Sequence, residues 1–341
     1  MKYNIALHRF SVFCAVCTFF LIIAGGLVTS TGSSLAVPDW PLAYGMVFPP
    51  MVGGILYEHG HRLIASFVGL LTVILCVWLW RREERRWMKG LGIAALGAVI
   101  AQGLLGGLTV VLLLPTPISV AHATLAQTFF AIVTSIALFT SRWWMDSPPI
   151  ADGVADIPLF KISLFTVLVV YVQLILGALM RHTGSGLVIP DFPLAYGQLF
   201  PSLSAEAMAR YNQQLIDSNI RLYADGAVTS SQILIHMVHR IWAVVVAITI
   251  GIFVAKLLRT PRLLPRVKKL AYGLTGLVAV QIVLGAYTVL SQKGVEIATA
   301  HVVVGALILV VSVQLVLHLA HSYDVRVKGI SFIYSTERAL T

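Results

Sequence analysis

Charged residues are scarce in this chain. They make up 11% of its 341 residues, against about 25% in soluble proteins. Hydrophobic residues make up 58%, and the mean hydropathy is +0.89. So little charge over so long a chain excludes an ordinary soluble domain, and the composition predicts a protein that crosses a membrane several times.

Cysteine is also rare. Cys14, Cys17 and Cys76 all fall in apolar stretches, so no disulfide is predicted on the oxidising side of a membrane. Cys14 and Cys17 have the CxxC spacing of redox and metal sites. A metal needs several ligands, however, and no others cluster there. We interpret these cysteines as small packing residues.

Basic residues outnumber acidic residues, which leaves a net charge of +10. The basic excess follows the second and the sixth apolar run, and by the positive-inside rule both segments are predicted to be cytoplasmic. The excess is thus explained by membrane topology, and no nucleic-acid partner is predicted. The residues concerned are Arg81, Arg82, Arg85, Arg86 and Lys89 in one segment, and Lys256, Arg259, Arg262, Arg266, Lys268 and Lys269 in the other.

Eight apolar runs reach the length of about 20 residues that a helix needs to cross a bilayer. The first run is predicted to stay in the protein, because it is long and lacks a small-residue cleavage site. No Arg- and Ser-rich transit sequence precedes it, which favours a bacterial inner membrane over an organelle. With eight spans, both termini are predicted to be cytoplasmic. The runs cover approximately residues 10–30, 59–80, 90–113, 118–140, 160–180, 232–255, 269–290 and 297–318.

The chain repeats itself. Residues 25–45 (GGLVTSTGSSLAVPDWPLAYG) match residues 177–197 (GALMRHTGSGLVIPDFPLAYG) at 13 of 21 positions. A repeat of about 150–180 residues is too long for a solenoid unit and is typical of a duplicated membrane bundle. Four spans per copy make the copies parallel. We therefore predict an all-α polytopic membrane protein, with eight transmembrane helices in two parallel-related four-helix bundles.

Domain boundaries follow from this duplication. We predict an N-terminal bundle over residues 1–140, a cytoplasmic linker over 141–160, a C-terminal bundle over 161–322 and a cytoplasmic tail over 323–341. The linker is rich in proline, glycine and acidic residues.

The repeated outer motif contains several prolines and glycines, so each outer loop is predicted to be ordered and to fold back over its bundle. A plain structural connector is the alternative. The second loop carries about 26 extra residues, of which about 204–218 form a predicted short surface helix. A cap or an oligomer contact is the only role that we assign to this insert.

Four histidines occupy matching places in the two copies. His61 and His122 are 61 residues apart, and His239 and His301 are 62 apart. All four lie near the outer ends of even-numbered spans, so the two members of each pair lie at the same depth. Zinc would want three or four protein ligands. A haem brings four equatorial nitrogens, and two histidines in an apolar four-helix bundle suit its iron.

Small residues beside these histidines agree with a flat macrocycle, although tight helix packing explains them equally well. They are Gly103, Gly106, Gly107, Gly285 and Ala286. Five further histidines are expected at the surface or at loop edges, and neither Arg181 nor His182 receives a role. These five are His8, His59, His182, His318 and His321.

Charged residues accompany the histidine pairs. Arg62 and Arg240 directly follow two of the candidate ligands and are predicted to bind haem propionates, with snorkelling to the membrane interface as the alternative. Glu58 lies three residues before His61 and therefore on the same helix face, whereas its counterpart is His236. This asymmetry indicates that one site does chemistry and the other carries electrons. The alternative is that Glu58 only neutralises Arg62.

The duplicated bundle, the TGSSL…PDWPL loop, the sequence Glu58-x-x-His61-Arg62 and the three partner histidines together resemble the haem A synthase family. The resemblance extends over roughly residues 8–320. In that family the C8 methyl group of haem O is oxidised to a formyl group by two successive hydroxylations with loss of water, which gives haem A for cytochrome oxidase. Some bacterial members carry a cysteine pair in the first outer loop, and this chain has none.

The resemblance implies residue roles. His239 and His301 would bind a haem b cofactor that relays electrons, and His61 and His122 would bind the substrate haem O. Glu58 matches the essential glutamate of the family. We interpret Glu58 as a group that moves protons or stabilises positive charge beside the reacting methyl.

The resemblance also implies a membrane location and candidate partners. The haem sites face the outer side of a bacterial inner membrane, and the haem O synthase that supplies the substrate is a candidate partner. Self-association is a second candidate, and the sequence names no electron donor. Two other functions stay open: a cytochrome b that relays electrons from a quinol, and a haem transporter or chaperone.

Overall fold

The computed structural model describes residues 3–146, 157–220, 226–260 and 263–322. Within these ranges the chain is helical. The helices are α1 (Ile5–Ser30), α2 (Gly53–Arg82), α3 (Arg86–Val111), α4 (Thr116–Phe139), α5 (Arg142–Asp146), α6 (Ile157–His182), the 3-10 helix η1 (Ser185–Leu187), α7 (Ala205–Asp217), α8 (Ser230–Leu258), α9 (Pro265–Leu290) and α10 (Val295–Ser322).

Eight of the described helices are long and apolar enough to cross a membrane, as predicted. The three short helices, α5, α7 and η1, are the exceptions. Helix α7 confirms the surface helix expected in the second loop, and it begins where the Ser204 side chain accepts a hydrogen bond from Ala207 N. Helix α8 begins at a capping box made by Thr229 and Gln232.

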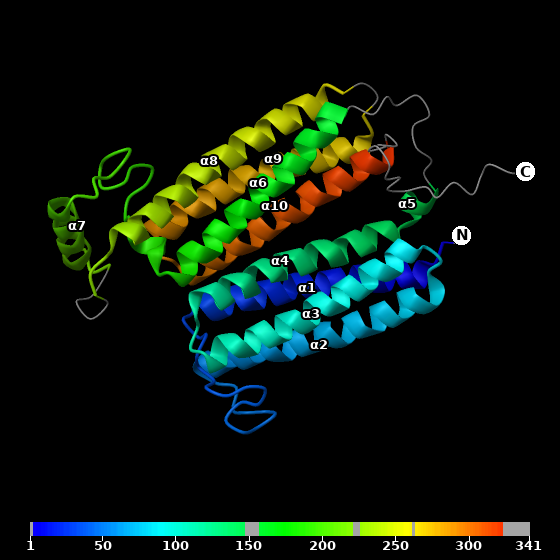
Figure 1. The fold of residues 1–341 in the computed structure, drawn as a ribbon, viewed down its shortest axis with the longest axis horizontal. Helices are drawn as coiled ribbons and strands as arrows, with labels where there is room; N and C mark the ends of the chain where they lie inside the picture. The colour runs from blue at the N-terminus through cyan, green and yellow to red at the C-terminus, as the bar shows by residue number, and fades with distance from the viewer. Residues whose placement is uncertain (1–2, 147–156, 221–225, 261–262, 323–341) are drawn as a thin grey trace, which may run out of the picture.

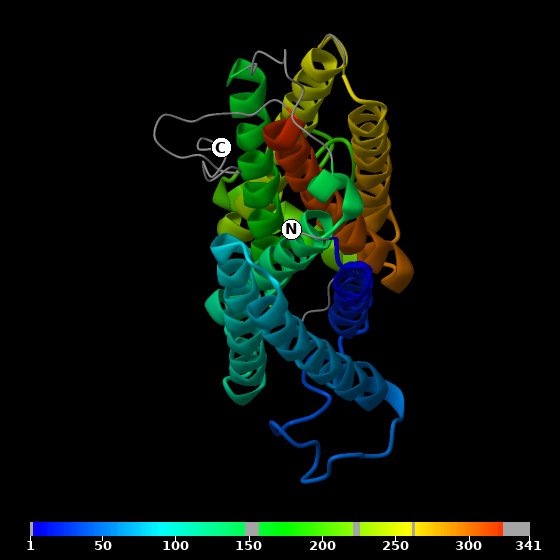
Figure 2. The ribbon, with the colours of Figure 1, turned by 90° about the vertical axis from the view of Figure 1, so that its right-hand side faces the viewer.

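The eight long helices form two bundles that lie side by side (Figure 1). Helices α1 to α4 pack against one another in the N-terminal bundle, and α6, α8, α9 and α10 do so in the C-terminal bundle. Each bundle has its own core of buried apolar side chains. Viewed from the end that carries the N-terminus, the two groups of helices stay separate (Figure 2).

The bundles meet along a seam where α1 packs on α10 and α4 packs on α6 and α10. A small apolar cluster fills part of this seam with Ile22, Phe130, Ala306 and Val310. The Thr128 hydroxyl also lies 2.7 Å from the Tyr171 hydroxyl across it. The described parts of the two bundles therefore share a packed interface and are not joined by chain connectivity alone.

The two ends of the molecule differ. The first loop (residues 31–52) and the described residues of the second loop (183–220 and 226–229, with η1 and α7) lie at one end, the loop end. The beginnings of α1, α3 and α9 and the short helix α5 lie at the other, the basic end. The predicted domain boundaries stay predictions. Of the linker, residues 147–156 lie outside the described residues, as does the tail 323–341.

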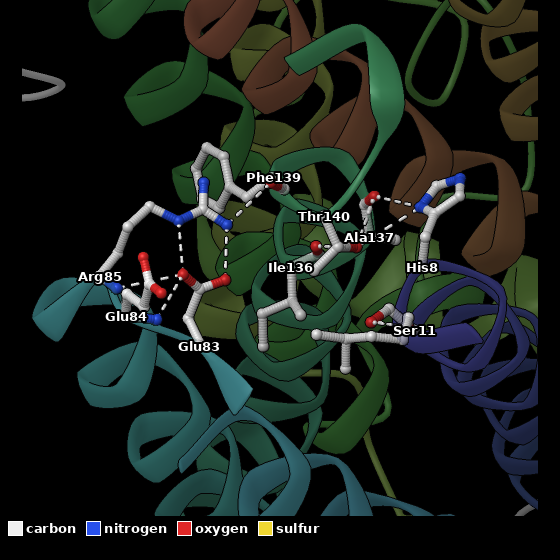
Figure 3. Close-up of polar contacts among 10 residues, drawn as sticks. His8, Ser11, Glu83, Glu84, Arg85, Ile136, Ala137, Phe139 and Thr140 are labelled. Atoms are coloured by element: carbon white, nitrogen blue, oxygen red, sulfur yellow. Dashed lines mark hydrogen bonds and ion pairs between the residues drawn. The ribbon is translucent and has the colours of Figure 1, made fainter. Parts of the chain in front are cut away.

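A buried ion pair fixes the first basic turn (Figure 3). Arg85 donates from Nε to Oε1 of Glu83 over 2.9 Å and from Nη2 to Oε2 over 2.7 Å. The same Nη2 donates to the Phe139 carbonyl at the end of α4, which would otherwise lack a partner. Burial raises the pKa of Glu83, but the bonds and the charge of Arg85 outweigh burial and hold that pKa below its usual value.

Aromatic stacking joins the halves at the basic end. Trp143 of α5 stacks on His318 with ring centroids 4.5 Å apart, and Trp144 stacks on His321 at 4.3 Å. Both histidines belong to α10 and are buried, with exposed fractions of 3% and 2%. The expectation that they lie at the surface is therefore wrong, because α5 folds back from the linker and covers them.

Candidate functional site

Each of the four matched histidines lies against a glycine on the neighbouring helix of its own bundle. A Cβ atom added to that glycine would come within 3.1 or 3.2 Å of Cε1 of the ring. Glycine at these places lets the imidazole approach the opposite backbone closely. The four pairs are Gly25 with His61, Gly106 with His122, Gly177 with His239, and Gly285 with His301.

The structure brings the histidines together in the predicted pairs. His61 lies close enough to His122 for a charge on one ring to affect the other, and the same holds for His239 and His301. Nδ1 of His61, His122 and His301 is buried and has no hydrogen-bond partner among the described residues. Buried polar atoms seldom lack a partner, so these rings suit a ligand that is not part of the chain.

The donor set fits a haem. Nowhere in the described part of the chain do three His, Cys, Asp or Glu side chains gather closely enough to hold a metal ion. A zinc site made by protein ligands alone is thus not formed there. A haem iron needs only one or two axial ligands, and paired imidazoles beside glycines meet that need. The individual ligand roles stay predictions.

Glu58 is buried beside the first pair, with 4% of the residue exposed. Its Oε2 accepts a hydrogen bond of 2.8 Å from Val37 N, and its Oε1 accepts one of 2.6 Å from Nη2 of Arg62. The ion pair with Arg62 lies inside the protein, because only 14% of the Arg62 side chain and 5% of the Glu58 side chain are exposed. Glu58 thus joins α2 to the underside of the first loop.

Arg62 and Arg240 hold the loops in equivalent ways. Nη1 of Arg62 donates to the Asp39 carbonyl over 2.7 Å, and Nη2 of Arg240 donates to the Asp191 carbonyl over 2.8 Å. Asp39 and Asp191 are equivalent positions of the repeat. In the described structure these guanidinium groups fasten loops to helices, and their predicted role toward haem propionates stays a prediction.

The two loops share a local fold. The carboxylate of each aspartate accepts hydrogen bonds of 2.7 and 2.8 Å from two successive backbone N–H groups five and six residues later. The tyrosine at the first of those positions donates from its hydroxyl to a backbone carbonyl eight residues earlier. The residues are Asp39, Tyr44, Gly45 and Ala36 in the first loop, and Asp191, Tyr196, Gly197 and Val188 in the second.

Comparison with known proteins agrees with this geometry. Residues 53–313 match the family described as cytochrome oxidase assembly protein, COX15-CtaA. The chain belongs to this family. It is similar to a haem A synthase of Alkalihalophilus pseudofirmus, with 31% identity over 64% of this chain and 73% of that protein. Haem A synthases of Shouchella clausii (32%, covering 59% of this chain and 68% of the relative) and Halalkalibacterium halodurans (31%, 60% and 70%) are similar too.

In this member of the haem A synthase family, the two pairs have different neighbours. Gln173 of α6 places Nε2 3.2 Å from Nδ1 of His239. The repeat position in the first half is Leu21, which offers no hydrogen bond. Nε2 of Gln281 likewise lies 3.4 Å from Nε2 of His301. The first half has Gln102 at the position of Gln281. Gln173 is therefore the side chain that distinguishes the surroundings of the second pair from those of the first.

The second loop is closed by its insert. Tyr211 of α7 stacks on Tyr196 with ring centroids 3.7 Å apart and planes 11° from parallel. Helix α7 contributes to a buried apolar cluster with the loop beneath it. The members from the loop are Val188, Ile189 and Ala195, and those from α7 are Ala207, Tyr211 and Leu215. The first loop carries no helix of this kind.

Sequence reasoning placed some residues wrongly or gave them no role. His59 was expected at the surface or a loop edge, but it is 4% exposed and its Nε2 lies 2.9 Å from the Val47 carbonyl under the first loop. Arg181 received no role, yet it reaches across the seam to the Ser30 hydroxyl. The only signal for Arg181 is that the first copy has Thr29 in its place.

Proposed function

We propose that this chain is a haem A synthase that oxidises the C8 methyl group of haem O to a formyl group and so produces haem A. The observation that carries the proposal is the pair of matched sites in one membrane protein. Both have two histidine rings that lie against glycines, and among the described residues a buried carboxylate, that of Glu58, accompanies the first site alone. Membership of the family and the haem A synthase relatives support the same reaction.

In this proposal the two sites have different occupants. His239 and His301 bind haem b, and His61 and His122 bind the substrate haem O. The extra hydrogen-bonding side chain Gln173 and the closed second loop suit a group that stays bound. When bound, haem b supplies one-electron redox chemistry for the oxidation.

Glu58 is the residue that we assign to the reaction itself. It lies one helical turn before His61, on the face that carries that ring. Its carboxylate is held by Val37 N–H and by Arg62, which fixes its direction and keeps it from bulk water. A carboxylate held in this way can accept a proton or stabilise positive charge next to a reacting group. Its counterpart His236 is buried too but carries no negative charge.

The membrane setting agrees with the substrate. Haem O carries a long apolar tail, and an apolar helical bundle within a bilayer can accommodate it. We assign the protein to a bacterial inner membrane, with the basic end in the cytoplasm by the positive-inside rule. The loop end and both haem sites then face outward. The haem O synthase is the partner that would supply the substrate.

Haem extraction and chromatography test the function. The protein is purified from cells with and without a supply of haem O, both as wild type and as Glu58→Gln. The wild type should carry haem b in both cases, and haem O together with haem A when haem O is supplied. Glu58→Gln should keep haem b and haem O but form no haem A, because Gln has the shape of Glu without its charge.

Three other outcomes would change the proposed function or the proposed role of Glu58. Two haem b per chain, unchanged by haem O, would mean an electron-relay cytochrome. Haem O bound and released without oxidation by the wild type would mean a transporter or chaperone. A normal yield of haem A from Glu58→Gln would remove Glu58 from the mechanism but leave the enzyme assignment intact.

A further inference from the structure

At Arg181 the second copy of the repeat motif has an arginine where the first copy has the uncharged Thr29. The motif residues Thr29-Ser30 of the first copy become Arg181-His182 in the second, while Thr-Gly-Ser follows in both. A cation at the end of a spanning helix is costly unless it is solvated or paired, and buried cations mark functional sites by default. Arg181 needs an explanation that its counterpart Thr29 does not.

The side chain is fixed at the seam between the bundles. Nη2 of Arg181 donates to the Ser30 hydroxyl over 2.9 Å and to the Gly26 carbonyl over 3.2 Å, both on α1. Thr299 of α10 donates to the same Ser30 hydroxyl over 3.1 Å. Three helices from both halves thus meet around this guanidinium.

This position is close to the second histidine pair. Arg181 lies four residues after Gly177, so it shares the face of α6 on which Gly177 lies against His239, one turn nearer the loop end. Thr299, which donates to the same Ser30 hydroxyl as Arg181, lies two residues before His301 on α10. The guanidinium is therefore close in the fold to both helices that carry residues of the second pair's site.

Arg181 has no acidic partner in the part of the chain that the structure describes. The ion pairs among the described residues involve Arg62, Arg85, Arg142 and Arg210, and none involves Arg181. No described residue forms a hydrogen bond with its Nη1 or Nε. A guanidinium presents five N–H donors in a fork that matches a carboxylate. Most of this donor capacity is unused, and a neighbouring anion would balance the charge.

We infer that Arg181 binds a propionate carboxylate of the haem held between His239 and His301, and that its charge helps both to retain this haem and to set its reduction potential. The inference rests on the proposed presence of haem b at the second pair. Arg240, the arginine that directly follows His239, already donates to the carbonyls of Leu194 and Asp191 in the second loop. The first half has only Thr29 at the equivalent place, so its haem would lack this anchor.

Two measurements on the full-length protein test the inference. The protein is produced without haem O, so that only haem b binds, and the haem is titrated with a reductant. Arg181→Gln should lower the equilibrium constant for reduction about tenfold, or ~59 mV for one electron. This is the expected direction because a positive charge stabilises the reduced haem. Arg210→Gln, which removes an exposed arginine of α7, is the matched control and should change nothing.

The second measurement tests how much the propionate carboxylate contributes to haem binding. Protein from haem-starved cells is reconstituted with iron protoporphyrin and with its dimethyl ester. The wild type should bind the free acid about tenfold more tightly, as a charge-assisted hydrogen bond is lost in the ester. Arg181→Gln should bind both equally. Arg181→Lys, which keeps the charge, should still prefer the free acid.

The outcomes separate this inference from its alternatives. An Arg181→Gln protein that keeps the wild-type potential and the preference for the free acid would show that Arg181 only ties α6 to α1, and would overturn the inference. If Arg181→Gln fails to fold, Arg181→Lys serves as the test. Loss of the preference for the free acid in Arg181→Lys would contradict the inference. A wild type that binds no haem b would instead overturn the proposed function.

Discussion

The first and second loops have the same local fold but are closed to different degrees. Tyr44 and Tyr196 donate to equivalent carbonyls, yet 51% of Tyr44 is exposed while Tyr196 is stacked beneath Tyr211. The first loop instead depends on contacts with the helices below it, through Glu58 and Arg62. The two copies of the repeated loop sequence thus keep one local fold and differ in what covers it. Under the proposed function, the covered loop lies over the cofactor that stays bound, and the open one lies over the substrate that enters and leaves.

The largest expected effect concerns the fit of the first loop on α3. A Cβ atom at Gly107 would lie 2.7 Å from Cδ2 of Trp40, so Gly107→Ala should displace the indole at a cost of about 1–3 kcal/mol. Chymotryptic cleavage of the first loop should accelerate, as mapped by mass spectrometry. Gly103→Ala on the same helix is the control, because its Cβ would meet nothing within 4 Å.

The second half suggests how to rescue this variant. It carries Phe192 and Ala286 at the positions of Trp40 and Gly107. The double variant Trp40→Phe, Gly107→Ala should therefore recover much of the protection that Gly107→Ala loses. Equal cleavage of the single and double variants would mean that the two residues do not act as a pair.

A smaller effect is expected at the cover of the second loop. Tyr211→Leu keeps an apolar side chain but loses the stacking on Tyr196, worth about 0.5–1.5 kcal/mol. Hydrogen exchange should rise in the second loop and stay constant in the first. Tyr211→Phe is the control: the Tyr211 hydroxyl has no hydrogen-bond partner among the described residues, so its loss should not weaken the stack. Faster exchange in both variants would mean that stacking is not what holds α7.

The smallest effect is a dependence of the first loop on pH. The N–H of Gly45, with that of Tyr44 and the charge of Arg62, lowers the pKa of Asp39 against some opposing desolvation. Since the pKa is lower in the folded loop, Asp39 stabilises the loop above the unfolded pKa of about 3.9. This stabilisation is lost as the pH falls through the folded pKa.

Hydroxyl-radical labelling of Tyr44 at a series of pH values measures this loss. Labelling should increase on acidification in the wild type. In Asp39→Asn it should be independent of pH over the same range. An equal acid response in both proteins would assign the change to another group.

The sequence predicted the eight spanning helices well, for physical reasons. A bilayer demands long apolar runs, and these are visible without knowledge of packing. The matched depth of His61 and His122 follows from helix rise and span number alone. The helix at 205–217 could be predicted too, because it carries an apolar stripe on a polar segment.

Contacts between the halves could not be predicted. Which face of α6 meets α1 depends on how two bundles pack, and small and apolar side chains occur on many faces of these helices. Arg181 therefore had no visible partner in the sequence, and α5 could not be foreseen to cover His318. The same holds for Arg62, whose bonds to loop carbonyls depend on the path of a loop and leave no sequence pattern.

One property of α10 has a consequence for biosynthesis. In its most apolar window 61% of the residues are buried inside the protein, against 11–39% for the other seven spans. It packs on α1, α4, α6 and α9. It follows all four in the chain and is therefore synthesised after them, so the faces of these helices that it covers stay without their partner until it is inserted. A chain that ended before α10 would lack the helix that packs on both halves.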